Sequence, residues 1–303
     1  MQGLERLRGV WNVVPTPFAE DGSLDEGSIA ALVDFVVGCG VDGLTILGVM
    51  GEVSRVSDAE RSRILEATLA AAGDRLPVCV GVSHAATDGA VRFAREAAAR
   101  GAHSVMLAPP ALSRPNDAAV RRHYFAVAEA VDVPIVVQDH PASSGVWMTV
   151  EFLASLAAES TKCRVVKLEE EPSAPKIRRL LAASPELLVL GGLGGMMLLE
   201  ELRAGAAGTM TGFGFPEILV DIVRRFRIGD GDGARDVFYR ACPLIRFENQ
   251  PLLNLPIRKY IYQRRGAIAS ARVRAPGGTL DVGTIADLDD LLAALGLPAG
   301  ARA

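Results

Sequence analysis

The sequence predicts an α/β fold, a (β/α)8 TIM barrel followed by a C-terminal helical extension. Between about residues 10 and 228, eight short apolar runs alternate with longer segments of helical period. Strict alternation favours a parallel sheet, and eight strand–helix units favour its closure into a barrel. The alternative is a doubly wound open sheet. It is disfavoured because no GxGxxG motif follows the first apolar run.

The strands are expected in short runs of aliphatic residues, and the helices between them in segments with suitable capping residues. The expected strands are Val10–Val14, Gly43–Leu47, Val78–Val82, Ser104–Ala108, Pro134–Gln138, Arg164–Leu168, Leu187–Leu190 and Ala207–Thr211. The clearest helices are Asp58–Ala72, Asp88–Arg100, Asp117–Ala130 and Thr149–Ala158, with Ser57, Thr87, Asn116 and Thr149 as N-caps and Gly40, Gly73, Gly101 and Gly205 as helix stops.

Beyond Pro216 the pattern is wholly helical. Helices are expected at roughly 217–228, 232–246, 251–265 and 284–296. We assign residues 1–228 to the barrel and residues 229–303 to a helical extension packed on it. The chain is then a single domain overall.

Composition excludes several classes of partner. The 303 residues carry a formal net charge of −4, from 32 basic and 36 acidic side chains, which gives no electrostatic reason to expect nucleic acid or an anionic membrane. No apolar run is long enough to span a bilayer, and the N-terminus lacks an apolar signal core. A cytoplasmic protein is therefore expected.

The cysteines and histidines are scattered. The four cysteines contain no CxxC pair, which favours reduced, buried thiols over a disulfide framework. The four histidines form no HxH or HxxxH pair, so the sequence offers no obvious zinc site. We expect neither a metal nor another cofactor.

Polar residues and glycines concentrate where the expected strands end. In a TIM barrel these C-terminal ends lie at one face, and active sites are built there. The strand ends are Pro15–Phe18, Gly48–Glu52, Gly81–His84, Pro109–Pro110, Gln138–Pro141, Lys167–Glu169, Gly191–Gly195 and Thr211–Gly214. The other strand positions stay aliphatic, so a site is predicted at this face.

Lys167 is the most informative residue. It lies at the end of an apolar run, on the same strand face as Val165 and Glu169. A lysine among aliphatic side chains loses hydration, which favours the free amine, a nucleophile toward ketones. Alternatively, Lys167 marks the end of a buried strand and extends its ammonium group into solvent.

The strand ends together resemble the superfamily of dihydrodipicolinate synthase and N-acetylneuraminate lyase. The resemblance rests on Val14–Phe18 followed by Asp21–Asp25, on Gly48–Glu52 ahead of Glu60-Arg61, and on Gly81-Val82, Gln138–Pro141 and Lys167. It implies a class I barrel in which Lys167 forms a Schiff base with a 2-keto acid. It further implies that Gly48, Val49, Met50 and Gly51 receive the substrate carboxylate, and that the chain forms a homo-oligomer, a tetramer or dimer of dimers.

The departures from this family are as informative as the matches. Val49 and Met50 replace two threonines of the family loop, and Gln138 replaces the tyrosine that usually relays protons. Ala111-Leu112 replaces a tyrosine pair, and Ser143-Ser144 stands where dihydrodipicolinate synthase has an arginine for a second carboxylate. Dihydrodipicolinate synthase activity itself is therefore not expected.

A subgroup of sugar-acid enzymes, the 2-keto-3-deoxy-L-arabonate dehydratases, is nearer. The resemblance to it rests on Gln138–Pro141, Lys167–Glu169, Thr209–Gly212 and Phe247–Asn249. On this basis Thr211 and Gly212 are expected at the substrate site.

Glu169 is the best candidate base because it shares a strand face with Lys167. Alternatively it only holds the lysine, and a tight pair would keep the amine protonated. Gln138 is expected to donate and accept hydrogen bonds in the site. His140 and His84 titrate near neutrality and are candidate proton shuttles, with structural loop residues as the alternative.

Three functions follow. The first is dehydration of a 2-keto-3-deoxy sugar acid through a Schiff base. The second is a class I aldolase of the same superfamily that releases pyruvate. The third is a non-catalytic paralogue that binds a keto acid.

Overall fold

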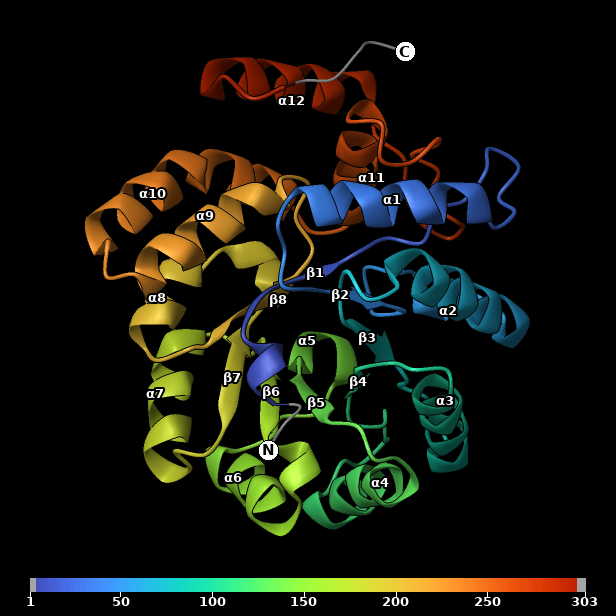
Figure 1. Cartoon of the computed structure of the whole chain (residues 1–303), viewed down its shortest axis with the longest axis vertical. Helices are drawn as coiled ribbons and strands as arrows, with labels where there is room; N and C mark the ends of the chain where they lie inside the picture. The colour runs from blue at the N-terminus through green and yellow to red at the C-terminus, as the bar shows by residue number, and fades with distance from the viewer. Residues whose placement is uncertain (1–3, 299–303) are drawn as a thin grey trace.

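Eight parallel strands close into a barrel in the computed structural model, which describes residues 4–298 (Figure 1). Each strand pairs with the next along the chain, and β8 pairs with β1 to close the ring. The strands are β1 Gly9–Val13, β2 Gly43–Ile46, β3 Val78–Gly81, β4 Ser104–Leu107, β5 Ile135–Asp139, β6 Val165–Leu168, β7 Leu188–Gly191 and β8 Gly208–Thr211. The predicted barrel is confirmed. Each predicted strand bound either agrees with the structure or differs from it by one residue.

The helices surround the barrel (Figure 1). They are α1 Glu26–Gly38, α2 Asp58–Ala72, α3 Thr87–Ala99, α4 Asp117–Ala130, α5 Pro141–Ser144, α6 Val150–Glu159, α7 Ser173–Ala183, α8 Leu198–Arg203, α9 Pro216–Arg227, α10 Gly231–Glu248, α11 Asn254–Arg264 and α12 Val282–Leu295. Short 3-10 turns lie at Glu5–Leu7, Val53–Arg55, Thr161–Cys163 and Leu193–Gly195. Among these described helices, none is both long and apolar enough to cross a membrane.

Three of the four predicted N-caps are confirmed. The side chains of Ser57, Asn116 and Thr149 each accept a hydrogen bond from a backbone N–H in the first helical turn. The prediction for Thr87 is wrong: the cap position of α3 is Ala86, whose N–H donates to His84 Nδ1 at 2.9 Å. The Thr87 hydroxyl contacts His123 Nδ1 of α4 at 3.0 Å instead.

Strand alternation fills the barrel interior with apolar side chains below the level of Lys167. The interior cluster is Leu7, Trp11, Val13, Cys79, Met106, Val136, Val165, Leu188, Leu190 and Met210. Trp11 packs against the backbone of Gly43 so closely that a Cβ there would lie 2.6 Å from the indole ring. The lumen is therefore a packed core that also holds the buried hydroxyls of Thr45 and Ser104 beside Cys79, and its buried ion pair lies at the C-terminal end.

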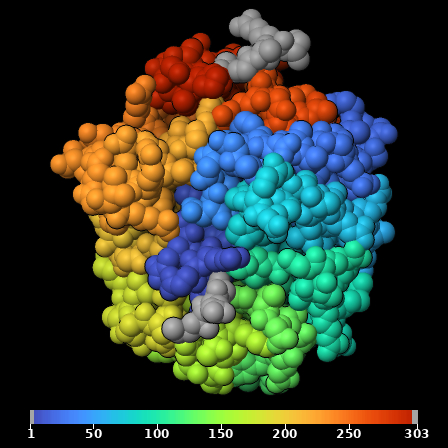
Figure 2. Space-filling view, in the orientation of Figure 1, coloured from blue at the N-terminus to red at the C-terminus, as the bar shows by residue number. Residues whose placement is uncertain are grey.

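The C-terminal helices pack on the barrel. Helix α10 lies against α9, and Tyr262 of α11 packs edge-on against Phe35 of α1 at 5.7 Å between ring centroids. The Tyr262 hydroxyl also accepts a hydrogen bond from Asn12 Nδ2 of β1 at 2.8 Å. In Figure 2 the orange and red C-terminal segment covers one side of the molecule, with α12 outermost in Figure 1.

A buried ion pair joins this extension to the β2–α2 loop. Lys259 Nζ of α11 lies 2.6 Å from Glu52 Oε1, and both side chains are fully buried. The other oxygen, Glu52 Oε2, accepts from the N–H of Arg274 at 2.9 Å and from Arg55 at 3.1 Å. Glu52 therefore connects the loop to two parts of the extension.

We propose that residues 229–303 unfold together with the barrel, and Lys259→Ala tests this. Removing Lys259 leaves the Glu52 carboxylate buried without its main counter-charge, which should lower the free energy of unfolding by about 3–5 kcal/mol. Urea unfolding followed by fluorescence and circular dichroism should show one shifted transition. The double variant Glu52→Gln/Lys259→Met removes both charges and should recover part of the loss. Two separate transitions in the wild-type protein would contradict the single domain.

A second buried carboxyl lies in the barrel wall. Glu201 of α8 is fully buried, and its Oε1 accepts from the Ser173 hydroxyl at 2.7 Å. Its Oε2 has no hydrogen-bond partner among the described residues and lies against the backbone of Gly191. Burial raises the pKa of Glu201 to about 7, and the hydrogen bond from Ser173 only partly opposes this. The folded protein therefore favours the protonated carboxyl.

The folded protein should lose stability as Glu201 ionises. The folded-state pKa lies above the ordinary value of 4.5, so the stabilisation is fully present below about pH 4.5 and is lost as the pH rises through about 7. Glu201→Gln should raise the free energy of unfolding at pH 8 by up to about 3 kcal/mol, with the gain shrinking toward pH 5. Urea titrations across this range measure it. The exposed Glu66→Gln serves as control, and a pH-independent effect of Glu201→Gln would contradict the prediction.

Candidate active site

Lys167 lies in the lumen at the C-terminal end of β6. Parallel pairing places it beside Gln138 of β5 and Leu190 of β7. The residue is only 5% exposed, and its Nζ lies 3.0 Å from Glu169 Oε2. Lys167 is therefore held inside the mouth of the barrel and does not extend into solvent, as the alternative interpretation required.

Three of the predicted residues meet at the Glu169 carboxylate. Besides Lys167, Gln138 Nε2 donates to Glu169 Oε2 at 2.8 Å, and all three side chains are buried. Burial alone would raise the pKa of Glu169. The positive charges of Lys167 and His140 and the hydrogen bonds from Gln138 and Lys167 outweigh it, so the pKa is lowered. Glu169 is accordingly a carboxylate at neutral pH.

The β7–α8 loop approaches this carboxylate closely. A Cβ at Gly192 would lie 2.4 Å from Glu169 Cγ, so any other residue there would displace the glutamate. The following residues Leu193–Gly195 form a 3-10 turn, and the N–H of Gly194 donates to Thr211 Oγ1 at 2.7 Å. The glycine run is therefore a tight turn that makes room for Glu169.

His140 lies beside this cluster. It is half-buried at the start of the short helix α5, where its carbonyl oxygen accepts from the N–H groups of Ser143 and Ser144. Its Nδ1 is buried and has no hydrogen-bond partner within residues 4–298. The imidazole is close enough to Glu169 for its charge to lower the pKa of that carboxyl.

A cavity of about 260 Å³ opens next to the Lys167–Glu169 pair. Gln138 belongs both to the cavity wall and to the hydrogen-bonded cluster. The wall is formed by Leu47, Gly48, Val49, Val53, Ser83, His84, Ala85, Met106, Ala108, Pro109, Pro110, Ala111, Gln138, Ser143 and Ser144. It contains hydroxyls, an amide and an imidazole, but no arginine or lysine.

The loop after β2 lines this cavity with Gly48 and Val49 and forms a tight turn. Gly51 and Glu52 donate back to Gly48 and Val49 at 3.0 and 3.1 Å, which closes the loop into a turn. Among the residues that the structure describes, none accepts a hydrogen bond from the N–H of Val49 or Met50. Such N–H groups at a turn suit a carboxylate.

The remaining predicted residues lie at the edge of the site. His84 is exposed on the cavity rim, where its Nδ1 accepts from the N–H of Ala86. Thr211 and Gly212 are not brought to the cavity wall: Thr211 accepts from Gly194, and a Cβ at Gly212 would lie 2.9 Å from an Arg258 nitrogen. Their contacts position the β7 and β8 loops, and their role in substrate binding stays a prediction.

The Phe247-Glu248-Asn249 motif has a similar supporting place. Glu248 is fully buried, pairs with Arg258, and accepts from the N–H of Gly214 at 2.8 Å. Asn249 Oδ1 accepts from Arg258 at 3.2 Å. The motif therefore connects helices α10 and α11 to the loop after β8.

Sequence reasoning missed a second charged cluster behind the first. Lys176 Nζ of α7 lies 2.6 Å from both Asp139 Oδ2 and Glu170 Oε2, on the outer side of β5 and β6. The available signal was alternation: Asp139 and Glu170 directly follow Gln138 and Glu169 and must face the opposite way. Nothing in the sequence indicated that Lys176 would reach them.

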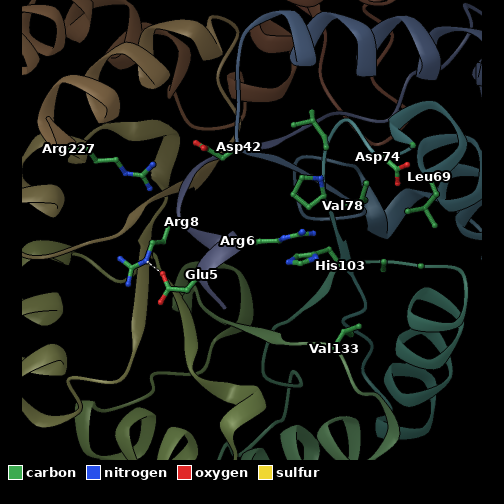
Figure 3. Close-up of a pocket in the computed structure, with 15 residues that line it drawn as sticks. Glu5, Arg6, Arg8, Asp42, Leu69, Asp74, Val78, His103, Val133 and Arg227 are labelled. Carbon is green, nitrogen blue, oxygen red and sulfur yellow. Dashed lines mark hydrogen bonds and ion pairs between the residues drawn. The ribbon is translucent and has the colours of Figure 1, made fainter. Parts of the chain in front are cut away.

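A larger cavity, about 770 Å³, lies at the opposite end of the barrel (Figure 3). Its wall includes Arg6, Arg8, His103 and Arg227, near the N-terminal ends of the strands. It contains none of the predicted site residues. In residues 4–298, no group of three or more His, Cys, Asp or Glu side chains is placed to hold a metal ion.

Comparisons with known proteins agree with this geometry. The model of the dihydrodipicolinate synthetase family matches residues 6–295. An L-2-keto-3-deoxyarabonate dehydratase of Azospirillum brasilense is 36% identical over 288 residues, which cover 93% of each chain.

Two solved structures share the fold over nearly their whole length. A dihydrodipicolinate synthase from Rhodopseudomonas palustris is 35% identical with a TM-score of 0.90, covering 95% of this chain and 97% of the other. A prophage protein of the dihydrodipicolinic acid synthase family from E. coli K12, solved in complex with pyruvate, is 26% identical with a TM-score of 0.90, covering 96% and 99%. The chain belongs to the dihydrodipicolinate synthetase family and is a lyase of that family.

Proposed function

We propose that the protein is a Schiff-base-forming hydro-lyase that dehydrates a 2-keto-3-deoxy sugar acid. The observation that carries the proposal is the Lys167–Glu169–Gln138 cluster beside a cavity without a cationic side chain in its wall. A substrate with one carboxylate suits such a cavity, because the N–H groups of Val49 and Met50 are available for one anionic group. The name of the relative from Azospirillum brasilense agrees with this substrate class.

The reaction begins with attack of the Lys167 amine on the C2 carbonyl of the keto acid. The carbinolamine loses its oxygen as water and becomes an iminium ion, which withdraws electrons from C3. Removal of a C3 proton gives an enamine, and the enamine expels the C4 hydroxyl, which leaves as water after taking up a proton. Hydrolysis of the iminium then releases the keto product and restores Lys167.

Glu169 serves as the base for C3 in this scheme. Its carboxylate is adjacent to the lysine that carries the substrate, and the Gln138 amide fixes one of its oxygens. The same pair also explains how the amine is freed. The ammonium transfers a proton to Glu169 when the keto acid binds, and Glu169 gives that proton to the carbinolamine hydroxyl, which leaves as water. The carboxylate then takes the C3 proton and passes it to the departing C4 hydroxyl.

The alternative is an aldolase that releases pyruvate. Cleavage of the C3–C4 bond would pass through an enamine on the same lysine, and a family relative was solved with pyruvate bound. A panel of 2-keto-3-deoxy acids separates the two. Dehydration retains all carbons in one keto product, whereas cleavage yields pyruvate and an aldehyde.

Lys167→Ala should abolish turnover while leaving the fold intact, because the nucleophile is lost. Wild-type protein treated with pyruvate and borohydride should gain a reduced adduct that peptide mass spectrometry locates at Lys167. Lys162→Ala, which removes a lysine from the opposite end of β6, should retain the adduct. A wild-type protein without an adduct at Lys167 would contradict both enzymatic mechanisms and favour a keto-acid-binding protein.

Glu169→Gln should lower kcat by about 10²–10⁴-fold and change KM much less, since the amide keeps the shape but cannot accept a proton. The neighbouring Glu171→Gln is exposed and serves as control. Steady-state kinetics with the best substrate of the panel measure both. A Glu169→Gln enzyme with unchanged kcat would leave Glu169 only the role of holding Lys167.

A further inference from the structure

A second buried lysine lies directly behind the proposed nucleophile. Strand alternation sends Gln138, Lys167 and Glu169 into the lumen, and Asp139 and Glu170 to the outer side of the same strand ends. Lys176 reaches the outer pair from α7 and is 4% exposed. The ends of β5 and β6 thus carry one charge cluster on the lumen side and another on the outer side. The residues of the two clusters are adjacent in sequence.

Lys176 joins three segments of the chain. Its Nζ lies 2.6 Å from Asp139, 2.6 Å from Glu170 and 2.7 Å from the carbonyl oxygen of Met148. The ends of β5 and β6 are also joined directly, by a hydrogen bond of 2.8 Å from the N–H of Glu169 to the carbonyl of Asp139. The Lys176 ammonium therefore connects the end of β5, which carries Gln138, to the end of β6, which carries Glu169.

The outer cluster has more negative than positive charge. Asp139 faces Lys176 of α7, Glu170 and Glu169 of the β6–α7 segment, and Tyr124 of α4. Its Oδ1 is buried and has no hydrogen-bond partner in the described residues. Burial raises the pKa of Asp139 to about 6, Lys176 opposes the rise, and Glu170 and Glu169 add to it. Lys176 is the cation that keeps this group ionised.

We propose that Lys176 is a positioning residue for the Schiff-base reaction: by binding Asp139 and Glu170 it holds the ends of β5 and β6 so that Gln138 and Glu169 meet at Lys167. This inference rests on the proposed function for its catalytic consequence. Its structural consequence, the environment of the Lys167 amine, does not require turnover.

The test compares Lys176→Met with Lys162→Met. Lys162 Nζ also donates to two carbonyl oxygens, of Ala128 and Val131, but near the opposite end of β6, so it is a matched loss of a hydrogen-bonded lysine. Reductive methylation with formaldehyde and cyanoborohydride, mapped by peptide at a series of pH values, reports the reactivity of Lys167 without any substrate. If Lys176 holds Glu169 at Lys167, its removal takes the carboxylate away from the Lys167 ammonium, which favours the free amine and should move the rate profile to lower pH. A shift to higher pH would be the effect of the lost charge alone and would overturn the inference.

We expect the Lys167 methylation rate at pH 7.5 to rise by about threefold or more in Lys176→Met, equivalent to a half-unit shift of the profile to lower pH. With the panel substrate, kcat should fall at least about tenfold while KM stays within about threefold. Lys176→Arg, which keeps the charge, should recover part of both. Lys162→Met should leave both unchanged.

An unchanged methylation profile in Lys176→Met would overturn the inference, even if the protein proves to be an enzyme. A wild-type protein with no pyruvate adduct would overturn the proposed function, while the methylation profile would still decide whether Lys176 acts on Lys167. If Lys176→Met does not fold, Asp139→Asn/Lys176→Met removes the buried charges together. Wild-type kcat in that folded variant would equally overturn the inference.

Discussion

A lysine and a glutamate share one face of one strand end, inside a barrel whose interior is otherwise uncharged, and the rest of the mouth is arranged around them. Burying two charges costs several kcal/mol for each ion unless they pair and their hydrogen bonds are satisfied. Glu169 meets this requirement with Lys167 and Gln138, and Gly192 leaves the space that its side chain needs. One carboxylate therefore contacts residues of β5, of β6 and of the β7 loop.

The proposed role of the Glu169 carboxylate also compensates for a proton relay that this chain lacks. Val49, Met50 and Gln138 stand where the family has hydroxyl side chains that relay protons. A chain without that relay needs another group that exchanges protons with the lysine-bound substrate. Glu169 is held 3.0 Å from Lys167, and Gln138 holds it there. The glutamine at position 138, where the family has a tyrosine, is then consistent with proton transfer by Glu169 in place of that tyrosine.

The fold was predictable because its determinants are local. Eight apolar runs, their caps and the polar strand ends are all visible in sequence, and alternation alone placed Glu169 on the face of Lys167. The details that failed depend on contacts between distant segments. Thr87 makes no capping hydrogen bond and contacts His123, and Lys176 reaches two carboxylates from another helix. A side chain that reaches a residue in a distant helix or strand leaves no periodic pattern in the sequence.

Hydrogen-bond satisfaction distinguishes the three buried lysines, which sequence alone does not. An ammonium can donate three hydrogen bonds. Lys176 has three acceptors within 2.7 Å, and Lys259 has Glu52 and the carbonyl of Arg272. Within residues 4–298, Lys167 has one ion-pair partner, Glu169. Deprotonating Lys176 or Lys259 would leave fixed carboxylates and carbonyls without a donor. Lys167 can pass its proton to its one partner, so of the three it is the lysine best suited to become a free amine.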